Sequence, residues 1–351
     1  MAKQIKCVVW DLDHTLWDGI LLESDEVTLK PSMKEVLTEL DERGILLSIA
    51  SRNDEAAVKE KLSAFGIEHF FLYPEIHWNA KSSSLKRISE RLNIHKDTIL
   101  FIDDQPFERE EVKAVHPEIT CWDAVDYLSL LTDDRLRPVF ITEDARRRRR
   151  MYLEADKRQQ EEEKYEGPPE KFLASLHMKF VISEAGEQDL QRAEELTVRT
   201  NQLNASGKTY DYEELDFFRQ SDSHFLLVCE LEDKFGSYGK IGLSLIEETG
   251  DTWHVKLLLM SCRVMSRGVG TILLTTILQE AKKRGKRLVA DFKQTDRNRM
   301  MYITYKFANF KEIEKGEDGY ILFENDLSMI QPFPEYVDVN IELNQKDPAK
   351  Q

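Results

Sequence analysis

Two aspartates follow directly after an apolar run near the start of the chain. Residues 8–10 (VVW) predict a strand, and Asp11 and Asp13 come next, one residue apart, before Thr15. Side chains at positions i and i+2 of a strand project to the same side, and open α/β sheets bind ligands at the carboxyl ends of their strands. One carboxylate could then attack phosphorus or hold a divalent cation while the other moves a proton. The alternative is that Asp13 caps a helix and Asp11 is a solvated strand end.

Further polar side chains follow two later strand patterns and open a helical one. They are Ser51, Arg52, Asn53, Lys81, Asp103 and Asp104. The first three end the apolar run at residues 46–50, Lys81 precedes the helical pattern of residues 82–92, and the acidic pair ends the run at residues 99–102. A hydroxyl and an ammonium group bind phosphate oxygens, and carboxylates hold the metal that neutralises the developing charge. The set therefore predicts a phosphoryl-transfer site.

These motifs, in this order, resemble the haloacid dehalogenase superfamily over residues 5–125. The resemblance implies a doubly wound parallel α/β sheet, with Asp11 as the nucleophile and Asp13 as the general acid/base. It also implies a substrate-binding set and a Mg²⁺ site. The substrate-binding set is Thr15, Ser51, Arg52, Asn53 and Lys81, and the metal set is Asp11, Asp13, Asp103 and Asp104. No cap-sized insertion lies between Thr15 and Ser51, so we expect a minimal cap and a site open to a large or protein-borne substrate.

Length, charge and cysteine usage limit the class of protein. A chain of 351 residues is long enough for two domains of ordinary size. Its 65 acidic and 49 basic side chains give a net charge of −16, which argues against nucleic acid as a partner. The four cysteines show no metal-site spacing, and no apolar run approaches membrane-spanning length. We therefore expect a cytoplasmic protein without a membrane partner.

The pattern of strands and helices divides the chain into four parts. Residues 1–138 alternate apolar strands with amphipathic helices, which is the pattern of a parallel sheet with helices on its faces. The resemblance above implies that they are a phosphatase domain of the haloacid dehalogenase type. Residues 139–176 are a linker, in which the almost wholly charged stretch 143–166 predicts an exposed connecting helix, more simply a solvated face than an anion site. Residues 177–327 predict a second α/β domain whose last helix lies near residues 299–306. Residues 328–351 are a polar tail for which no site is expected.

A glycine-rich turn in the second domain precedes a helical pattern at residues 271–284. Arg267, Gly268 and Gly270 could cradle a phosphate, because glycines allow close backbone approach and a helix N-terminus favours an anion. The arrangement resembles the GNAT acyltransferase fold, whose equivalent loop grips the pyrophosphate of coenzyme A. Met265 departs from the basic or amide side chain usual at that position, so a phosphopantetheine arm held by this loop and Arg263 is the expected ligand.

Cys262 lies at the end of the strand pattern of residues 252–260, just before the glycine-rich turn. Neighbouring cations and a helix N-terminus lower the pKa of a thiol and favour the thiolate nucleophile. The alternative is a buried structural cysteine at a strand end. The other three cysteines lie within apolar runs and are expected in the core; they are Cys7, Cys121 and Cys229.

Motifs from both domains resemble the FkbH-like family, the glyceryl transferase/phosphatases of polyketide pathways. The matching segments are WDLDHTLW (residues 10–17), IDDQPFERE (102–110), RTNQLN (199–204) and SCRV (261–264). The resemblance implies transfer of a D-glyceryl unit from 1,3-bisphosphoglycerate onto an acyl carrier protein, with loss of both phosphates. Cys262 would then be the candidate carrier of the acyl thioester. Residues 295–298 (TDRN) depart from the family's usual run, which leaves the substrate contacts there open.

Three alternatives remain on the sequence alone. The chain could be a Mg²⁺-dependent phosphatase whose second domain only docks a partner, a metabolite N-acyltransferase fused to a phosphatase, or a docking scaffold with a degenerate site. The intact acidic and lysine motifs count against the scaffold, and Met265 counts against the acetyltransferase. Cys262 separates the glyceryl transferase from the plain phosphatase.

Overall fold

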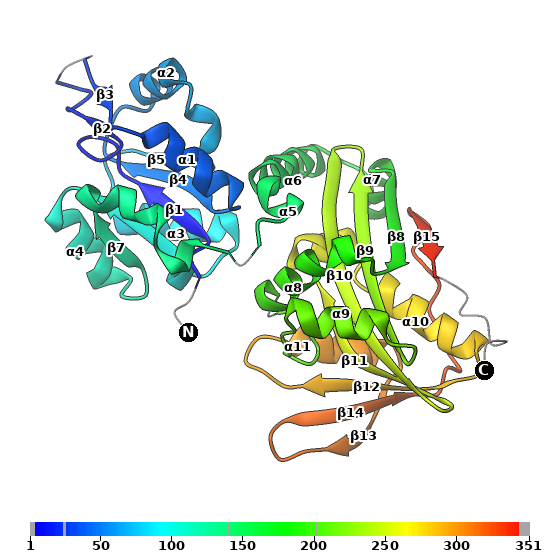
Figure 1. Ribbon diagram of the computed structural model, residues 1–351. Coiled ribbons are helices and arrows are strands. Elements are labelled where there is room, and N and C mark those ends of the chain that lie inside the picture. The colour runs from blue at the N-terminus through cyan, green and yellow to red at the C-terminus, as the bar shows by residue number, and fades with distance from the viewer. Residues whose placement is uncertain (1–3, 24–25, 139, 201, 344–351) are drawn as a thin grey trace. The chain divides into compact units, whose positions relative to one another are not determined.

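The computed structural model describes residues 4–23, 26–138, 140–200 and 202–343. The chain divides into two compact units, Met1–Asp156 and Lys157–Gln351 (Figure 1). The boundary falls inside helix α6 (Arg148–Glu163). No helix of the described residues is long and apolar enough to cross a membrane.

The first unit is built on a parallel sheet in the order β5-β4-β1-β6-β7. Its strands are β1 (Cys7–Trp10), β4 (Leu46–Ser51), β5 (Glu75–Ile76), β6 (Ile99–Asp103) and β7 (Thr120–Asp123). A small hairpin, β2 (Trp17–Asp18) with β3 (Thr28–Leu29), is the only other sheet among the described residues of this unit. The parallel strands therefore present their carboxyl ends along one edge.

Helices cover both faces of this sheet because the strands are apolar on both sides (Figure 1). Val8 and Trp10 pack with α1 (Met33–Glu42) and α2 (Glu55–Phe65). Cys7 and Val9 pack with α3 (Lys81–Leu92) and α4 (Pro106–Val115). Short 3₁₀ helices complete the unit at Glu68–Phe70, Lys96–Thr98, Ala124–Leu131 and Asp134–Leu136. The expected doubly wound α/β class is confirmed.

The arginine run at the end of the first unit is not a bare solvated face, as the sequence suggested. After the short α5 (Glu143–Arg146), the α6 side chain of Arg148 donates to the carbonyl of Gly44 at 2.8 Å. Arg149 forms an ion pair with Asp41 at 2.9 Å. Arg148 and Arg149 are therefore held to the first unit by a hydrogen bond and an ion pair.

The second unit is built on a mixed sheet in the order β13-β14-β12-β11-β10-β9-β8-β15. The strands are β8 (Met178–Glu184), β9 (His224–Asp233), β10 (Gly236–Thr249), β11 (Thr252–Met260), β12 (Arg287–Lys293), β13 (Lys311–Lys315), β14 (Tyr320–Asn325) and β15 (Val337–Glu342). Strands β8 to β11 are antiparallel neighbours, and β11 pairs in parallel with β12 after the crossover helix α10 (Ile272–Lys283). The expected α/β class is confirmed here too.

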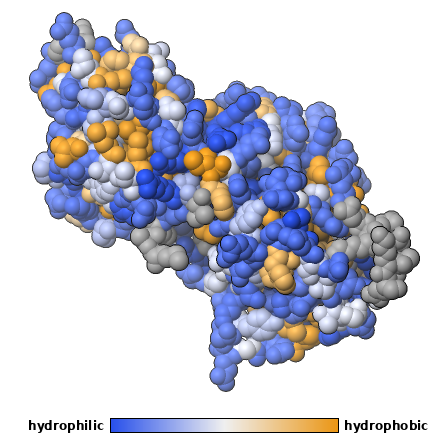
Figure 2. Space-filling view, in the orientation of Figure 1, coloured by the Kyte–Doolittle hydropathy of each residue, from blue (hydrophilic) through white to orange (hydrophobic). Residues whose placement is uncertain are grey.

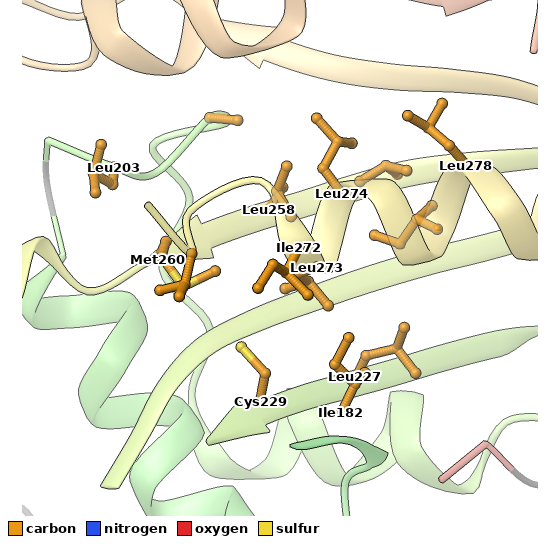
Figure 3. Close-up of a cluster of buried hydrophobic side chains, with 14 of the residues drawn as sticks. Ile182, Leu203, Leu227, Cys229, Leu258, Met260, Ile272, Leu273, Leu274 and Leu278 are labelled. Carbon is orange, nitrogen blue, oxygen red and sulfur yellow. The ribbon is translucent and has the colours of Figure 1, made fainter. Parts of the chain in front are cut away.

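The two faces of this sheet carry separate cores. On one face, side chains of α10 such as Ile272 and Leu274 meet strand residues Leu227 and Cys229 (Figure 3). Helix α11 (Arg299–Phe307) and α7 (Pro169–Ser175) join that core. On the other face, α8 (Leu190–Arg199) and α9 (Tyr212–Gln220) cover a second cluster. The 3₁₀ helices of this unit are Glu187–Asp189 and Cys262–Arg267.

Three strands near the C-terminus were not predicted. Strands β13 and β14 follow α11, which was expected to close the domain, and β15 lies in the segment expected to be a tail. Strand β15 pairs with β8 at the edge of the sheet, where alternation of apolar and polar residues suits a half-exposed strand. In the view of Figure 2 the surface is largely hydrophilic, with hydrophobic residues scattered over both units.

Candidate active site

The candidate site of the first unit lies where three neighbouring strands end. Trp10 of β1 pairs in register with Ile49 of β4 and with Ile102 of β6, so Asp11 and Asp103 follow side by side. The amide of Asp11 still donates to the carbonyl of Ile102 at 2.9 Å, which fixes the backbone at this point. From β1 the strand order runs outward through β4 and β5 on one side and through β6 and β7 on the other. Open α/β sheets bind ligands at such a reversal of strand order.

Three carboxylates converge there. Asp11, Asp103 and Asp104 each offer an oxygen within 4.8 Å of the others. Asp11 and Asp103 are buried, and the buried Oδ1 of Asp104 forms no hydrogen bond within the described residues. A group of buried carboxylates with an unsatisfied oxygen fits a hard divalent cation, which takes oxygen ligands and keeps several waters.

Lys81 joins two of these carboxylates. Its Nζ donates to Asp11 Oδ1 at 2.6 Å and to Asp103 Oδ2 at 2.5 Å. It is the first residue of α3, as the sequence predicted, and only 4% of it is exposed. An ammonium group has three donors, so one remains for a phosphoryl oxygen.

The charges of this group act on one another. Burial and the neighbouring charge of Asp11 raise the pKa of Asp103 to about 7, although Lys81 opposes the shift. Burial and Asp11 also raise the pKa of Asp104. Burial would lower the pKa of Lys81, but the charges and hydrogen-bond acceptors of its two partners outweigh it and raise that pKa. The site thus holds excess negative charge that one ammonium group offsets only in part.

Asp13 lies outside the three-carboxylate group and is held by donors of its own. Its Oδ1 accepts hydrogen bonds from Trp17 Nε1 at 2.8 Å and from the amide of Leu21 at 3.1 Å. Its Oδ2 accepts one from Asn53 Nδ2 at 3.0 Å, so a lone pair of Oδ2 remains for a proton. This placement suits a proton carrier better than a side-chain metal ligand.

The remaining expected residues surround this centre in different ways. Ser51 is buried at the end of β4. The Oγ1 of buried Thr15 accepts a hydrogen bond from the amide of Asp104 at 3.1 Å, so Thr15 positions the acidic pair. Arg52 forms an ion pair with Glu108 at 2.9 Å and is 36% exposed. Asn53 orients Asp13 in the structure rather than facing solvent.

Three positioning residues were missed by the sequence analysis. Trp17 holds Asp13, Glu108 holds Arg52, and Arg109 donates to the carbonyl of Asp103 at 2.7 Å. Trp17 lies four residues after Asp13, and both Glu108 and Arg109 lie in the first turns of the helix that follows the acidic pair. Polar or aromatic residues so close to the motif were the available signal.

Cys262 is the exposed cysteine of the second unit and opens the 3₁₀ helix after β11. Cys7 and Cys229 are fully buried, and burial raises the pKa of each thiol well above its ordinary value. Burial also raises the pKa of half-buried Cys121 to about 11. Cys262 is therefore the thiol best placed to react with a solute.

The glycine-rich turn is less open than the sequence suggested. Arg267 is buried, and its Nη1 donates to Glu162 of α6 at 3.1 Å, while its Nε is unpaired within the described residues. Gly268 has a φ of 68°, and a Cβ there would collide with the hydroxyl of Tyr336. Arg263 bonds Ser261, and Gly270 lies in open space. Arg267 thus faces the protein and not a solvent-filled cradle.

Comparison with known proteins shows which family the first unit resembles. Residues 17–116 match the haloacid dehalogenase-like hydrolase family. The first unit contains a haloacid dehalogenase-like hydrolase domain. A human protein, magnesium-dependent phosphatase 1, is 28% identical over 140 residues, which cover 34% of this chain and 78% of that protein.

Solved structures resemble each part of the chain. The N-terminal part of a Bacteroides fragilis protein, containing a phosphatase domain complexed with Mg, is 28% identical with a TM-score of 0.33. It matches 38% of this chain, and this chain covers 40% of that one, less than two thirds of its length. The ribosomal-protein-S18-alanine N-acetyltransferase of Escherichia coli is 17% identical with a TM-score of 0.33, over 44% of this chain and 97% of its own.

Proposed function

We propose that this chain is a magnesium-dependent phosphatase joined to an acyl-transferring unit. It would move a D-glyceryl unit from 1,3-bisphosphoglycerate onto an acyl carrier protein, with loss of both phosphates. The phosphatase half is supported by the convergence of Asp11, Asp103 and Asp104 beside Lys81, within a hydrolase-type domain. The glyceryl specificity is supported by the family resemblance of motifs in both units.

The residues of the first unit suit hydrolysis of a phosphomonoester. The Asp11 carboxylate would attack phosphorus as the bond to the substrate oxygen breaks, and Asp13 would give its proton to the departing alkoxide. Asp13 would then take a proton from the water that releases phosphate from Asp11. Lys81 would bind a phosphoryl oxygen through its remaining donor.

Magnesium would be held by Asp11, Asp103 and Asp104 and, when bound, would neutralise the charge that develops on the phosphoryl oxygens. The donor set fits this ion, because all three ligands are carboxylates and Oδ1 of Asp104 lacks another partner among the described residues. Lys81 alone leaves the three carboxylates with excess negative charge, which a divalent ion would balance.

The exposed thiol of Cys262 suits the acyl half of the reaction. Its thiolate would attack the carbonyl carbon of the acyl phosphate, the carbon–oxygen bond to phosphate would break, and phosphate would leave with the electron pair. The carrier protein's phosphopantetheine thiol would then accept the acyl group. In a variant of this scheme the carrier thiol attacks the donor directly and Cys262 only contacts the arm.

A second candidate function is a phosphatase whose second unit only docks a partner. The pairing of buried Arg267 with Glu162, and the contact of Gly268 with Tyr336, favour it because they fill the turn expected to bind the carrier arm. Under this function Cys262 would carry no acyl group.

Intact-protein mass spectrometry separates the two functions. The full chain is mixed with Mg²⁺, 1,3-bisphosphoglycerate and a carrier protein bearing its phosphopantetheine arm. Glyceryl transfer predicts a glyceryl adduct on the carrier, preceded by an acyl adduct on the enzyme that the Cys262→Ser variant lacks. Phosphate release without an acyl adduct on either protein would leave only the phosphatase.

A further inference from the structure

A second polar cluster surrounds Asp291 in the second unit. Asp291 lies on β12 and is 4% exposed. Its Oδ1 accepts a hydrogen bond from the hydroxyl of Tyr320 on β14 at 2.7 Å and lies 2.6 Å from Nε2 of His254 on β11. Three strands therefore place their side chains around one buried carboxylate.

Two lysines approach the other oxygen of this carboxylate. The Nζ atoms of Lys256 and Lys208 lie 3.7 Å and 3.8 Å from Asp291 Oδ2, beyond hydrogen-bond range. The side chain of Lys208 is 52% exposed and that of Lys256 is 28% exposed. Neither ammonium group is within hydrogen-bond distance of this oxygen, so both keep donors for a further partner.

The charges of the cluster leave its two lysines only loosely paired. Burial alone would raise the pKa of Asp291, but hydrogen bonds from His254 and Tyr320 and the nearby positive charges lower it, so the group is a carboxylate at neutral pH. Two ammonium groups, those of Lys208 and Lys256, face the Asp291 carboxylate at distances longer than a hydrogen bond. A second acid, Glu247, has its Oε2 3.8 Å from the Nζ of Lys256. Because neither lysine is within hydrogen-bond distance of a carboxylate here, an incoming phosphate could accept hydrogen bonds from both.

The strand pairing is irregular next to the cluster. Val255 pairs with Ile246 and Leu257 with Leu245, so Lys256 is the extra residue of a β-bulge, a device that re-aims a side chain. The parallel pairing of β11 with β12 ends at Val255 and Ala290, immediately before Asp291. The cluster therefore lies where the two strands part.

Two asparagines, Asn204 and Asn298, hold the loop that carries Lys208. The buried Asn298 donates from Nδ2 to the carbonyl of Asn204 at 3.0 Å. Asn204 in turn donates to the carbonyl of Lys208 at 3.0 Å and accepts from the amide of Gly207 at 2.9 Å. The RTNQLN and TDRN segments thus position a lysine of the cluster; Asn201, within the first, lies outside the described residues.

We propose that Lys208, Lys256 and His254, around Asp291, form a second phosphate-binding site, which holds a phosphate of the small acyl phosphate donor in the second unit. This inference rests on the proposed acyl transfer and deepens it by naming where the donor is bound. Lysines provide the point charges that suit phosphate. Asp291 orients the ring of His254 through Nε2, so its Nδ1 donates to a phosphate only when the imidazole is protonated. Neither the phosphatase residues nor Cys262 belong to this cluster.

The test measures binding without turnover. 3-Phosphoglycerate is titrated into the full chain in the presence of a chelator, so that the carboxylate-rich first site lacks its metal and nothing is hydrolysed. The ring proton signals of His254, assigned by their loss in a His254→Gln variant, report the second unit separately. Inorganic phosphate and glycerate are titrated in parallel.

We expect His254 signals to shift with 3-phosphoglycerate and with phosphate but not with glycerate. Lys208→Met and Lys256→Met should each weaken the affinity about tenfold, the effect of losing one charged partner. Lys283→Met, an exposed lysine on α10 with its own partner Glu280, should leave it unchanged. No shift of the His254 signals, an equal response to glycerate, or unchanged affinity in both lysine variants would overturn the proposal. This measurement does not depend on glyceryl loading of the carrier protein. If glyceryl loading fails, the binding result therefore remains valid.

Discussion

Replacing Lys81 by methionine should make the first unit dependent on a divalent cation for its stability. Lys81 lies between two buried carboxylates, with a third close by. Breaking a buried ion pair by removing one partner costs about 3–5 kcal/mol, because an uncompensated charge is left behind. The variant should lose stability by about that amount in a chelator, and Mg²⁺ should restore most of it by supplying positive charge at the same carboxylates.

The loss should also depend on pH. In the folded chain the pKa of Asp103 is raised to about 7, whereas an unfolded aspartate titrates near 3.9. The folded state therefore binds the extra proton between those values, and stability falls as the pH rises through that window. Without Lys81 the carboxylates repel more strongly, so the variant should lose more at pH 8 than at pH 6, where one carboxyl is protonated.

Hydrogen–deuterium exchange followed by peptide mass spectrometry measures this effect for the first unit alone. Peptides covering β1 and β6 report it, and peptides from β10 and β11 serve as the internal reference. Lys86→Met is the matched control, since Lys86 lies on the same helix, is 59% exposed and pairs with Glu90 at 3.8 Å. It should change stability by less than about 1 kcal/mol. Equal protection of the Lys81→Met and parent chains in chelator, or no recovery with Mg²⁺, would show that Lys81 does not offset the charge of these carboxylates.

Three further outcomes follow from the same structure. Asp11→Asn should lower phosphate release from 3-phosphoglycerate by at least about a thousandfold, since covalent catalysis contributes several kcal/mol; a colorimetric phosphate assay checks it. Asn53→Ala should lower kcat by about tenfold or more and change KM less, because it removes the hydrogen bond to Oδ2 of Asp13 and leaves binding groups in place. Iodoacetamide should alkylate Cys262 far faster than Cys229, whose thiol pKa is raised by burial; peptide mapping that finds equal rates would contradict this.

Much of the first site could be predicted from sequence because its parts are local. Each functional residue ends a strand or opens a helix, and parallel strands bring such ends together whatever the loops contain. Asp11, Asp103 and Lys81 meet as expected for this reason. The sequence does not show which carboxylate takes which role. Two donors to Asp13, Trp17 and Leu21, are close to it in sequence, but Asn53 lies 40 residues away and meets it only through the fold.

The second unit was less predictable because its decisive contacts are long-range. Arg267 was expected to face an anion, but it is buried and paired with Glu162, 105 residues earlier in the chain. Lys208 and Asp291 likewise meet only through the fold. Strand β15 has a readable alternation of Val337, Val339 and Ile341 with polar residues, but the polar and proline-rich stretch before it suggested a tail. Local pattern identifies such elements and does not identify their partners.

The most direct test of the account is to locate the phosphoryl group during turnover. The full chain is mixed with Mg²⁺ and 1,3-bisphosphoglycerate, quenched in acid and digested, and the peptides are analysed by mass spectrometry. We expect an acid-stable phosphoryl group on the peptide that contains Asp11, absent in chelator and absent in Asp11→Asn. Normal phosphate release by Asp11→Asn, or a phosphoryl group on another residue in its place, would contradict the assignment of the nucleophile.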